Sequence, residues 1–163
     1  MEKVTHDNIQ PVYQEDSQIL ILGSIPSPKS REYGFYYAHP QNRFWKVLAD
    51  VYEEPFPYTI EERVSFLYRN KIALWDVLSS CMIDGADDSS IKEPIANNIS
   101  DLLKHTNIKK IYTTGRKAYD LYNKLCFQNT GVPAALLPST SPANCRVKYS
   151  ELLSAYQIVK KGE

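Results

Sequence analysis

Hydrophobic positions along the chain form short apolar runs that alternate with longer segments of helical spacing. Apolar runs that end in turn residues predict strands at Ser17–Leu22, Lys71–Leu78, Lys109–Thr113 and Ala134–Leu137. Helical spacing predicts helices at Pro40–Tyr52, Thr59–Arg69, Asn98–His105, Arg116–Cys126 and Val147–Val159. Because strands that alternate with helices need crossover connections, we expect an α/β fold, a three-layer α/β/α sandwich. Its central sheet should be mostly parallel, with about four strands.

The carboxyl ends of the predicted strands carry short polar loops rich in Gly, Pro, Ser and Thr. Ligands bind at this edge of open parallel sheets. The stretch GFYYAHPQNRFW, residues 34–45, follows the first loop and should lie at the same edge. Its Phe44 and Trp45 fall on the apolar face of the predicted helix, so we assign them to the core. Tyr37 precedes that helix in a loop, where its ring face is available to a flat ligand.

Length and composition indicate one globular domain over residues 1–163, with 43% hydrophobic and 23% charged residues. No apolar run approaches the roughly 20 residues of a membrane span, and the first residues do not resemble a secretory signal. We therefore expect a cytoplasmic protein that acts as a monomer, away from membranes. The 19 basic and 19 acidic residues cancel, but a local basic patch is enough to bind nucleic acid.

Several kinds of chemistry lack their usual motifs. The three cysteines are far apart and not in CxxC pairs, so we expect neither disulfides nor a metal site, and no cofactor. The loop GSIPS matches neither nucleotide-binding glycine motif nor the GxSxG elbow of serine hydrolases. Of three histidines, only His39 is expected near this edge of the sheet, so a Ser/His/acid triad is poorly supplied. An aromatic segment beside polar loops instead favours a flat ligand that is held by stacking and hydrogen bonds, such as a base extruded from a nucleic acid.

Four segments, in this order at the ends of alternating strands, resemble a known family: LGSIPS, YYAHPQNRFWKVL, ALWDVL and LPSTSPAN. They are similar to the uracil-DNA glycosylase superfamily, and most of all to its hypoxanthine-DNA glycosylase branch, which is related to the mismatch-specific uracil glycosylases. The similarity runs from Ile19 to about Tyr156, and AHPxNRFW is its most specific part. It implies a monofunctional, metal-free enzyme that cleaves the N-glycosidic bond of a deaminated base in DNA. Hypoxanthine is the expected base, with uracil as a second candidate.

The resemblance also implies roles for single residues. Mismatch-type relatives carry a water-positioning asparagine where this chain has Ile25, and in the hypoxanthine branch Asn42 is implied to take over. The alternative is that Asn42 bonds only the backbone of the helix's first turn. His39 could orient the leaving base or cap the helix. Asp76 could contact the base, activate the water, or satisfy loop amides.

Further contacts are expected around the base and along the DNA strand. The residues expected at the base are Gly23, Ser24, Ile25, Tyr37, Asp76, Ser139 and Ser141. Those expected along the DNA are Ser27, Lys29, Arg31, Arg43, Thr140, Pro142, Ala143, Asn144 and Arg146. Pro142 and Ala143 form the expected wedge in the duplex, and the basic side chains meet phosphates.

Two other functions compete with excision. A catalytically silent binder of damaged or single-stranded DNA would explain the isoleucine at position 25. A small-molecule hydrolase would use Ser24 or Ser27 as its nucleophile. For excision itself we expect a largely dissociative cleavage in which dipoles of the first loop stabilise the departing base.

Overall fold

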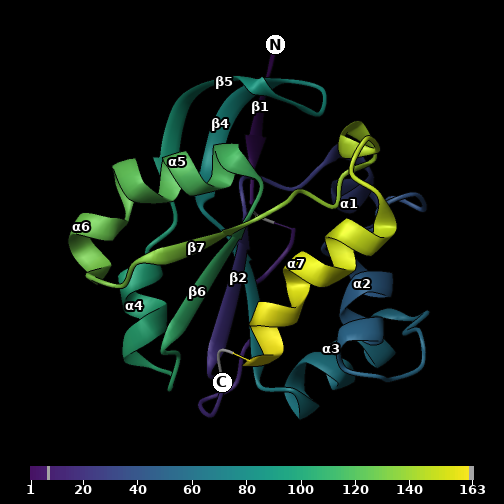
Figure 1. The fold of residues 1–163 in the computed structure, drawn as a ribbon. Coiled ribbons are helices and arrows are strands. Elements are labelled where there is room, and N and C mark those ends of the chain that lie inside the picture. Colours follow the sequence, from purple (N-terminus) through teal and green to yellow (C-terminus); the bar gives the residue numbers. More distant parts are fainter. Residues whose placement is uncertain (7, 162–163) are drawn as a thin grey trace.

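A computed structural model describes residues 1–6 and 8–161 of the chain. Its centre is a parallel four-stranded sheet that lies between two groups of helices (Figure 1). Across the sheet the strands run in the order β3 (Ile72–Asp76), β2 (Ile19–Gly23), β6 (Lys110–Thr114) and β7 (Ala134–Leu137). All three strand pairs are parallel. The expected three-layer sandwich with a mostly parallel sheet is confirmed.

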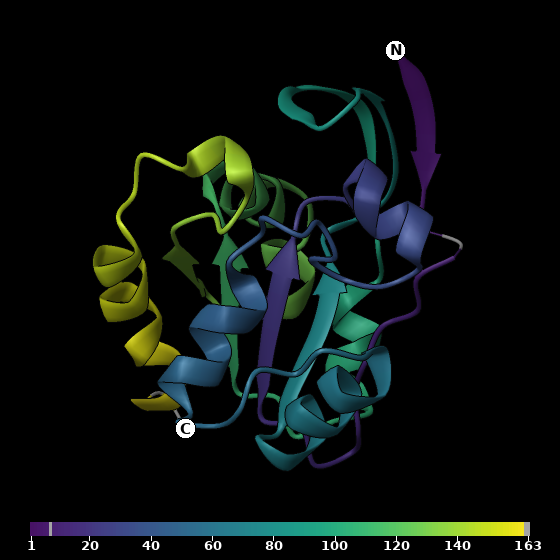
Figure 2. The ribbon, with the colours of Figure 1, turned by 90° about the vertical axis from the view of Figure 1, so that its right-hand side faces the viewer.

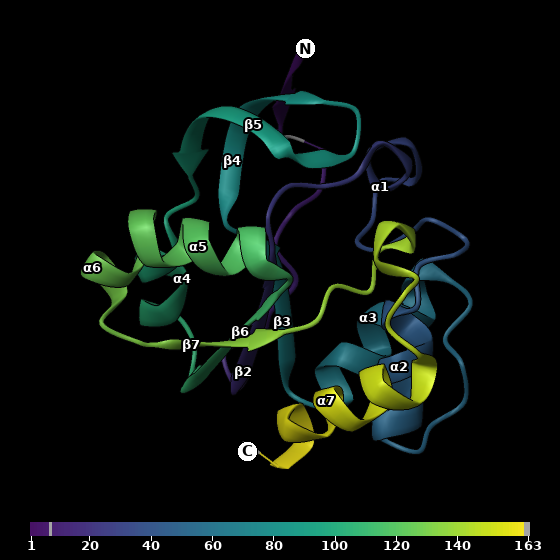
Figure 3. The same ribbon diagram turned by 45° about the horizontal axis from the view of Figure 1, so that its top comes forward.

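Alternate residues of β2 supply the two halves of the core. Ile19 and Ile21 belong to the cluster on one face, whereas Leu20 and Leu22 belong to the cluster on the other. A strand covered on both faces reads as a continuous apolar run, and ILIL is such a run. The first face is covered by α2 (Phe44–Val51), α3 (Ile60–Arg69) and α7 (Tyr149–Lys161). The second is covered by α4 (Ile99–Lys104) and α5 (Arg116–Leu125), with the short α6 (Phe127–Thr130) beside them (Figure 3).

Helix starts follow their capping residues. At α3 the hydroxyl of Thr59 accepts a hydrogen bond from the Glu62 amide, and the Glu62 carboxylate accepts one from the Thr59 amide, both at 3.0 Å. This is the capping box that the sequence predicts. Helix α2 begins at Phe44 rather than at Pro40, because a turn closed by the Asn42 amide and the His39 carbonyl precedes it.

A second, antiparallel sheet was not predicted. It consists of β1 (Glu2–Thr5), β4 (Leu78–Asp84) and β5 (Asp87–Ala96), with β4 in the middle. The segment expected as a loop after β3 is therefore mostly strand. Because β5 is largely exposed and polar, it carries no apolar run to mark it. Figure 2 shows this sheet rising beyond the carboxyl ends of β2 and β3, next to α1 (Pro28–Tyr33).

The two sheets together enclose the edge where polar residues gather. The carboxyl ends of the parallel strands form the floor, and the turn between β4 and β5 overhangs it. Within the described residues, no helix is both long and apolar enough to cross a membrane.

Candidate active site

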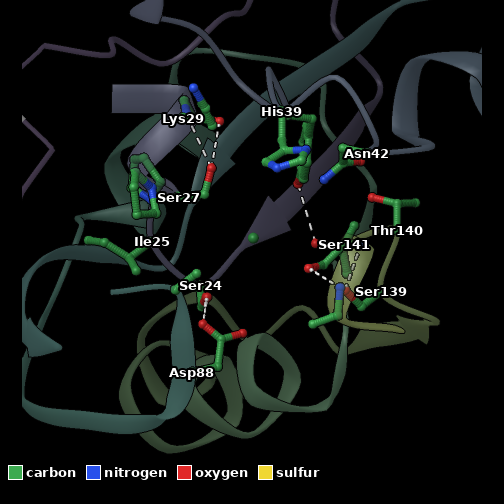
Figure 4. A pocket seen from close by; sticks show the side chains of 18 of the residues that line it. Ser24, Ile25, Ser27, Lys29, His39, Asn42, Asp88, Ser139, Thr140 and Ser141 are labelled. Atoms are coloured by element: carbon green, nitrogen blue, oxygen red, sulfur yellow. Dashed lines mark hydrogen bonds between the residues drawn. The ribbon is translucent and has the colours of Figure 1, made fainter. Parts of the chain in front are cut away.

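A cavity of about 320 Å³ lies at the carboxyl ends of the parallel strands, and we call it the strand-end cavity. Its size falls within the range of small-molecule sites. The loop after β2, the loop before α2, the β4–β5 turn and the loop after β7 each contribute walls. Figure 4 shows Asn42 and His39 on one side of this cavity, and Ser24 with Asp88 on the opposite side. The cavity brings together segments that are more than 100 residues apart in the chain.

Tyr37 lies in this cavity with its ring against the core. The ring stacks on that of Phe44, with centroids 3.8 Å apart and planes inclined by 16°. Its hydroxyl lies 3.3 Å from the Thr114 hydroxyl, within hydrogen-bonding distance. The backbone of Tyr37 has a φ of 52°, a left-handed conformation that costs a side chain about 1 kcal/mol. Packing on the fully buried Phe44 therefore holds one ring face. Tyr37 is half-buried and lines the cavity, where its ring can serve as a stacking surface.

Replacing Tyr37 with alanine is expected to weaken binding of lesion-containing DNA by about 10- to 100-fold, because base–aromatic stacking contributes roughly 1–3 kcal/mol. Tyr37→Phe keeps the ring and loses only the contact with Thr114, so its affinity should stay within about threefold of wild type. Fluorescence anisotropy with a labelled duplex measures both. Equal affinities of the two variants would exclude a stacking role.

Asn42 makes the backbone hydrogen bond that one alternative required, and it also lies at the cavity, as the catalytic alternative requires. Its Oδ1 accepts a hydrogen bond of 2.9 Å from the Phe44 amide, which caps α2. The same side chain lines the strand-end cavity, and Figure 4 shows its amide nitrogen directed toward the cavity. Since Oδ1 already serves the helix, the group that Asn42 offers to a ligand is chiefly an N–H donor.

His39 is also placed both as a turn residue and as a wall. Its Nδ1 accepts a hydrogen bond of 3.1 Å from the Gln41 amide, which closes the turn before α2. The ring nevertheless lines the strand-end cavity. In the neutral ring the proton therefore sits on Nε2, which makes that nitrogen a donor.

Asp76 forms the floor of the cavity and is held by a histidine that the sequence analysis missed. Asp76 ends β3, is only 3% exposed, and its Oδ2 lies 2.8 Å from Nε2 of His6. Its Oδ1 lies beside Gly23, 2.6 Å from the place where a Cβ would stand. Burial lowers the pKa of His6, but the hydrogen bond and the negative charge of Asp76 outweigh it, so the pKa is raised overall. His6 is thus biased toward its protonated, imidazolium form.

Asp88 is a second wall residue that the sequence analysis missed. The Ser24 hydroxyl donates a hydrogen bond of 3.0 Å to Oδ1 of Asp88, which lies on β5. Desolvation raises the pKa of Asp88, and the charge of Asp76 adds to this, while Ser24 and Lys117 oppose it. Ser24 donates to a carboxylate rather than to a histidine, so its hydrogen bond does not form the Ser/His pair of a catalytic triad. The small-molecule hydrolase hypothesis loses support accordingly.

The loop after β7 is pre-formed by its own hydrogen bonds. The Ser139 hydroxyl accepts from the Ser141 amide, the Ser141 hydroxyl accepts from the Ala143 amide, and the Asn144 side chain donates to the Ser139 carbonyl. The short 3₁₀ helix η1 (Pro142–Asn144) completes the loop. Ser139, Ser141, Pro142 and Ala143 line the strand-end cavity as expected, whereas Asn144 braces the loop from within.

Arg43 and Thr140 have different surroundings from those expected of DNA contacts. The Arg43 guanidinium donates to the carbonyls of Val147 and Asn144, at 2.7 and 3.2 Å. Thr140 is 1% exposed, and its carbonyl accepts from the Arg43 amide. Arg43 thus holds the loop after β7, and Thr140 is buried in that loop while also lining the strand-end cavity. Their contacts with DNA stay a prediction.

The remaining basic residues and Ser27 divide between the cavity and the outer surface. Lys29 lines the cavity, and its Nζ lies 3.4 Å from a carboxylate oxygen of Glu32. Arg31 instead pairs with Glu2, at 3.5 Å, and does not line the cavity. Arg146 is exposed on the loop before α7, also outside the cavity lining. Ser27 caps α1 by accepting from the Ser30 amide.

One cavity brings together Gly23, Ile25 and the catalytic candidates. Ile25 is 9% exposed and packs in the apolar cluster on the α4–α5 face. Among residues 1–6 and 8–161, no group of three or more His, Cys, Asp or Glu side chains could hold a metal ion.

Comparisons with known proteins give consistent results. The sequence profile of the uracil DNA glycosylase superfamily matches residues 10–159. The chain is 36% identical over 138 residues to a hypoxanthine DNA glycosylase from Methanosarcina barkeri, across 83% of this chain and 86% of that protein. A hypoxanthine DNA glycosylase from Methanosarcina acetivorans is 35% identical over 137 residues, across 83% and 85%. The solution structure of a candidate uracil DNA glycosylase from Methanosarcina acetivorans superposes with a TM-score of 0.82 at 31% identity, over 94% of this chain and 95% of that one.

Proposed function

Because the chain belongs to the uracil DNA glycosylase superfamily, we propose that it is a monofunctional DNA glycosylase that releases hypoxanthine from DNA. The two relatives named hypoxanthine DNA glycosylase support this choice of base, since both align over more than four-fifths of the chain. The observation that carries the proposal is the convergence of Tyr37, Asn42 and Asp76 on one strand-end cavity. Hydrolysis of the N-glycosidic bond needs a stacked base, a donor near the sugar and a group that reads the base edge.

The base would enter the cavity after leaving the helical stack. Tyr37 stacks on one face of the base, supported from behind by Phe44. Oδ1 of Asp76 accepts a hydrogen bond from N1–H of hypoxanthine. Adenine has an unshared electron pair at N1 instead of a hydrogen, and a buried acceptor left without its donor rejects such an analogue strongly. Uracil presents N3–H next to a carbonyl, so the same contact admits it as a second candidate.

Cleavage then breaks the bond between C1′ and N9, and its electron pair goes to the departing base. Backbone amides of the loop after β2 stabilise the negative charge that develops there, an effect that is often the largest in catalysis. Asn42 donates from its amide nitrogen to the sugar or to the water beside C1′, which restrains both in a reactive geometry. Addition of water to C1′ of the oxocarbenium-like sugar completes the hydrolysis. One proton of that water passes to solvent, and the released base anion takes up a proton from solvent.

The test uses labelled duplexes that contain a single deoxyinosine, a single deoxyuridine or no lesion. Each is incubated with excess protein and then treated with alkali, which breaks the strand at abasic sites. We expect breaks at deoxyinosine and none in undamaged DNA. No break at either lesion would overturn the proposed activity.

A catalytically silent binder is the second candidate, and Ile25 is the feature that favours it. The resemblance to mismatch-type glycosylases implies an asparagine at this position, and a buried aliphatic side chain cannot orient a water as an asparagine does. Lesion-dependent binding without abasic product, even at protein excess, would support this candidate over excision.

We also propose that the protein works as a monomer in the cytoplasm. Residues of a single chain enclose the strand-end cavity, so a second copy is not needed to complete it. Sedimentation of the protein with and without a lesion duplex measures the number of copies bound. A complex that contains two copies on one lesion would contradict the monomer.

A further inference from the structure

We propose that His6 is a positioning residue that keeps the Asp76 carboxylate oriented for reading the base. The proposal rests on the proposed excision of a base by this site. It adds a residue that the sequence motifs do not contain, since His6 lies outside residues 10–159, where the family profile matches. The N-terminal strand β1 would then belong to the active site rather than to the periphery of the fold.

Burial of both partners is the first observation. The side chains of His6 and Asp76 are each 5% exposed, and Nε2 lies 2.8 Å from Oδ2. Burying an ionised carboxylate is costly unless a partner compensates it. His6 is the partner that the structure provides, from 70 residues away in the sequence.

The setting of the imidazole is the second observation. Pairing of β1 with β4 brings the N-terminal segment to the cavity floor, and the His6 amide continues it by donating to the Ser79 carbonyl. The ring centroid lies 6.0 Å from that of Tyr36 and 6.5 Å from that of Trp75, the latter in an edge-on arrangement. Packing of this kind fixes the ring, so its hydrogen bond acts on Asp76 from a rigid position.

The chemical consequence concerns the other carboxylate oxygen. With Oδ2 bound to His6, rotation of the carboxylate is restrained and Oδ1 stays beside Gly23, in the wall of the cavity. Because His6 donates to Oδ2, Oδ1 is left as the carboxylate oxygen that can accept a hydrogen bond from N1–H of the base.

The experiment compares His6→Phe with His6→Gln in single-turnover release of hypoxanthine from a deoxyinosine duplex. Phenylalanine fills the space but donates nothing, so the rate should fall about 10- to 100-fold, the usual cost of losing an orienting hydrogen bond. Glutamine can donate to Oδ2 and should recover most of that loss. The dissociation constant for the same duplex should change less than about threefold. His105→Phe, at an exposed histidine after α4, is the matched control and should keep the wild-type rate.

A double-mutant cycle separates positioning from folding. In an Asp76→Ala background there is no carboxylate to orient, so adding His6→Phe should cause no further loss of rate. A further loss in that background would overturn the proposal, as would a wild-type rate for His6→Phe. Because the double variant contains no unpaired buried carboxylate, it can be assayed even if His6→Phe alone unfolds. If the wild-type protein releases no hypoxanthine, the proposed function is refuted instead. That outcome is distinguishable, because every variant would then be inactive as well.

Discussion

Replacing Asn42 with serine is expected to lower the single-turnover rate of base release by about 100- to 1,000-fold, the usual effect of deleting one preorganised donor. The serine hydroxyl can still accept from the Phe44 amide and cap α2, as Oδ1 of Asn42 does at 2.9 Å. The substitution removes the amide nitrogen of Asn42, which points toward the strand-end cavity. Quenched-flow release of hypoxanthine measures the rate, and thermal unfolding reports whether the cap survives.

Asn42→Ala provides the comparison that assigns the two roles. Alanine removes both the cap and the donor, so it should match the serine variant in rate and lose about 1 kcal/mol more of unfolding free energy. If Asn42→Ser instead restores the wild-type rate, the side chain acts only on the helix. The catalytic group would then have to be sought elsewhere in the cavity, with His39 as the next donor to test.

The parts of the fold that follow local rules could be predicted from the sequence. The run ILIL predicts a strand covered on both faces, and in the structure its residues alternate between the two core clusters. The pair Thr59 and Glu62 predicts the start of α3 because a capping box is a contact between near neighbours. Phe44 and Trp45 are fully buried, as their helical spacing indicates.

The site itself was only half predictable, and the missing half consists of long-range contacts. Strand ends of a parallel sheet share one edge, so the loops that carry Tyr37, Asn42 and Asp76 could be expected to meet. Through the antiparallel sheet, Asp88 reaches the cavity and His6 reaches the Asp76 carboxylate in the cavity floor. Strand β5 of that sheet is too exposed and polar to show a period. The Asp84–Gly85 pair, a common turn sequence, was the available signal for that hairpin.

Contacts within the protein also determine which basic residues can meet a DNA phosphate. A sequence gives arginine a charge but does not show where its five donors are used. Arg43 donates to two backbone carbonyls, and Arg31 pairs with Glu2 outside the cavity. Lys29 also has an acidic neighbour, Glu32, but it differs from Arg31 in lining the cavity, where a phosphate could approach it.

Replacing Gly23 with alanine is expected to reduce base release by about 100-fold, the usual penalty for misplacing a reacting group by 1 Å. A Cβ at this position would lie 2.6 Å from Oδ1 of Asp76 and 3.2 Å from the Tyr37 hydroxyl. His6 holds the other oxygen of Asp76, so the carboxylate cannot turn away without breaking that bond. The added methyl group therefore displaces the base-reading oxygen or narrows the cavity. Single-turnover rates with a deoxyinosine duplex measure the loss.

Gly131→Ala is the matched control because it should lower stability and leave the rate unchanged, the opposite of what Gly23→Ala should do. Gly131 ends α6 with a φ of 69°, and an added Cβ would meet no atom within 4 Å. Alanine in that left-handed conformation costs about 1 kcal/mol of stability, but nothing connects the position to the strand-end cavity. Gly131→Ala should thus lower the unfolding temperature and keep the wild-type rate, whereas Gly23→Ala should lose rate while remaining folded. If the two variants release the base at equal rates, the close approach of Gly23 to Asp76 plays no part in excision, because both substitutions would then affect only the stability of the fold.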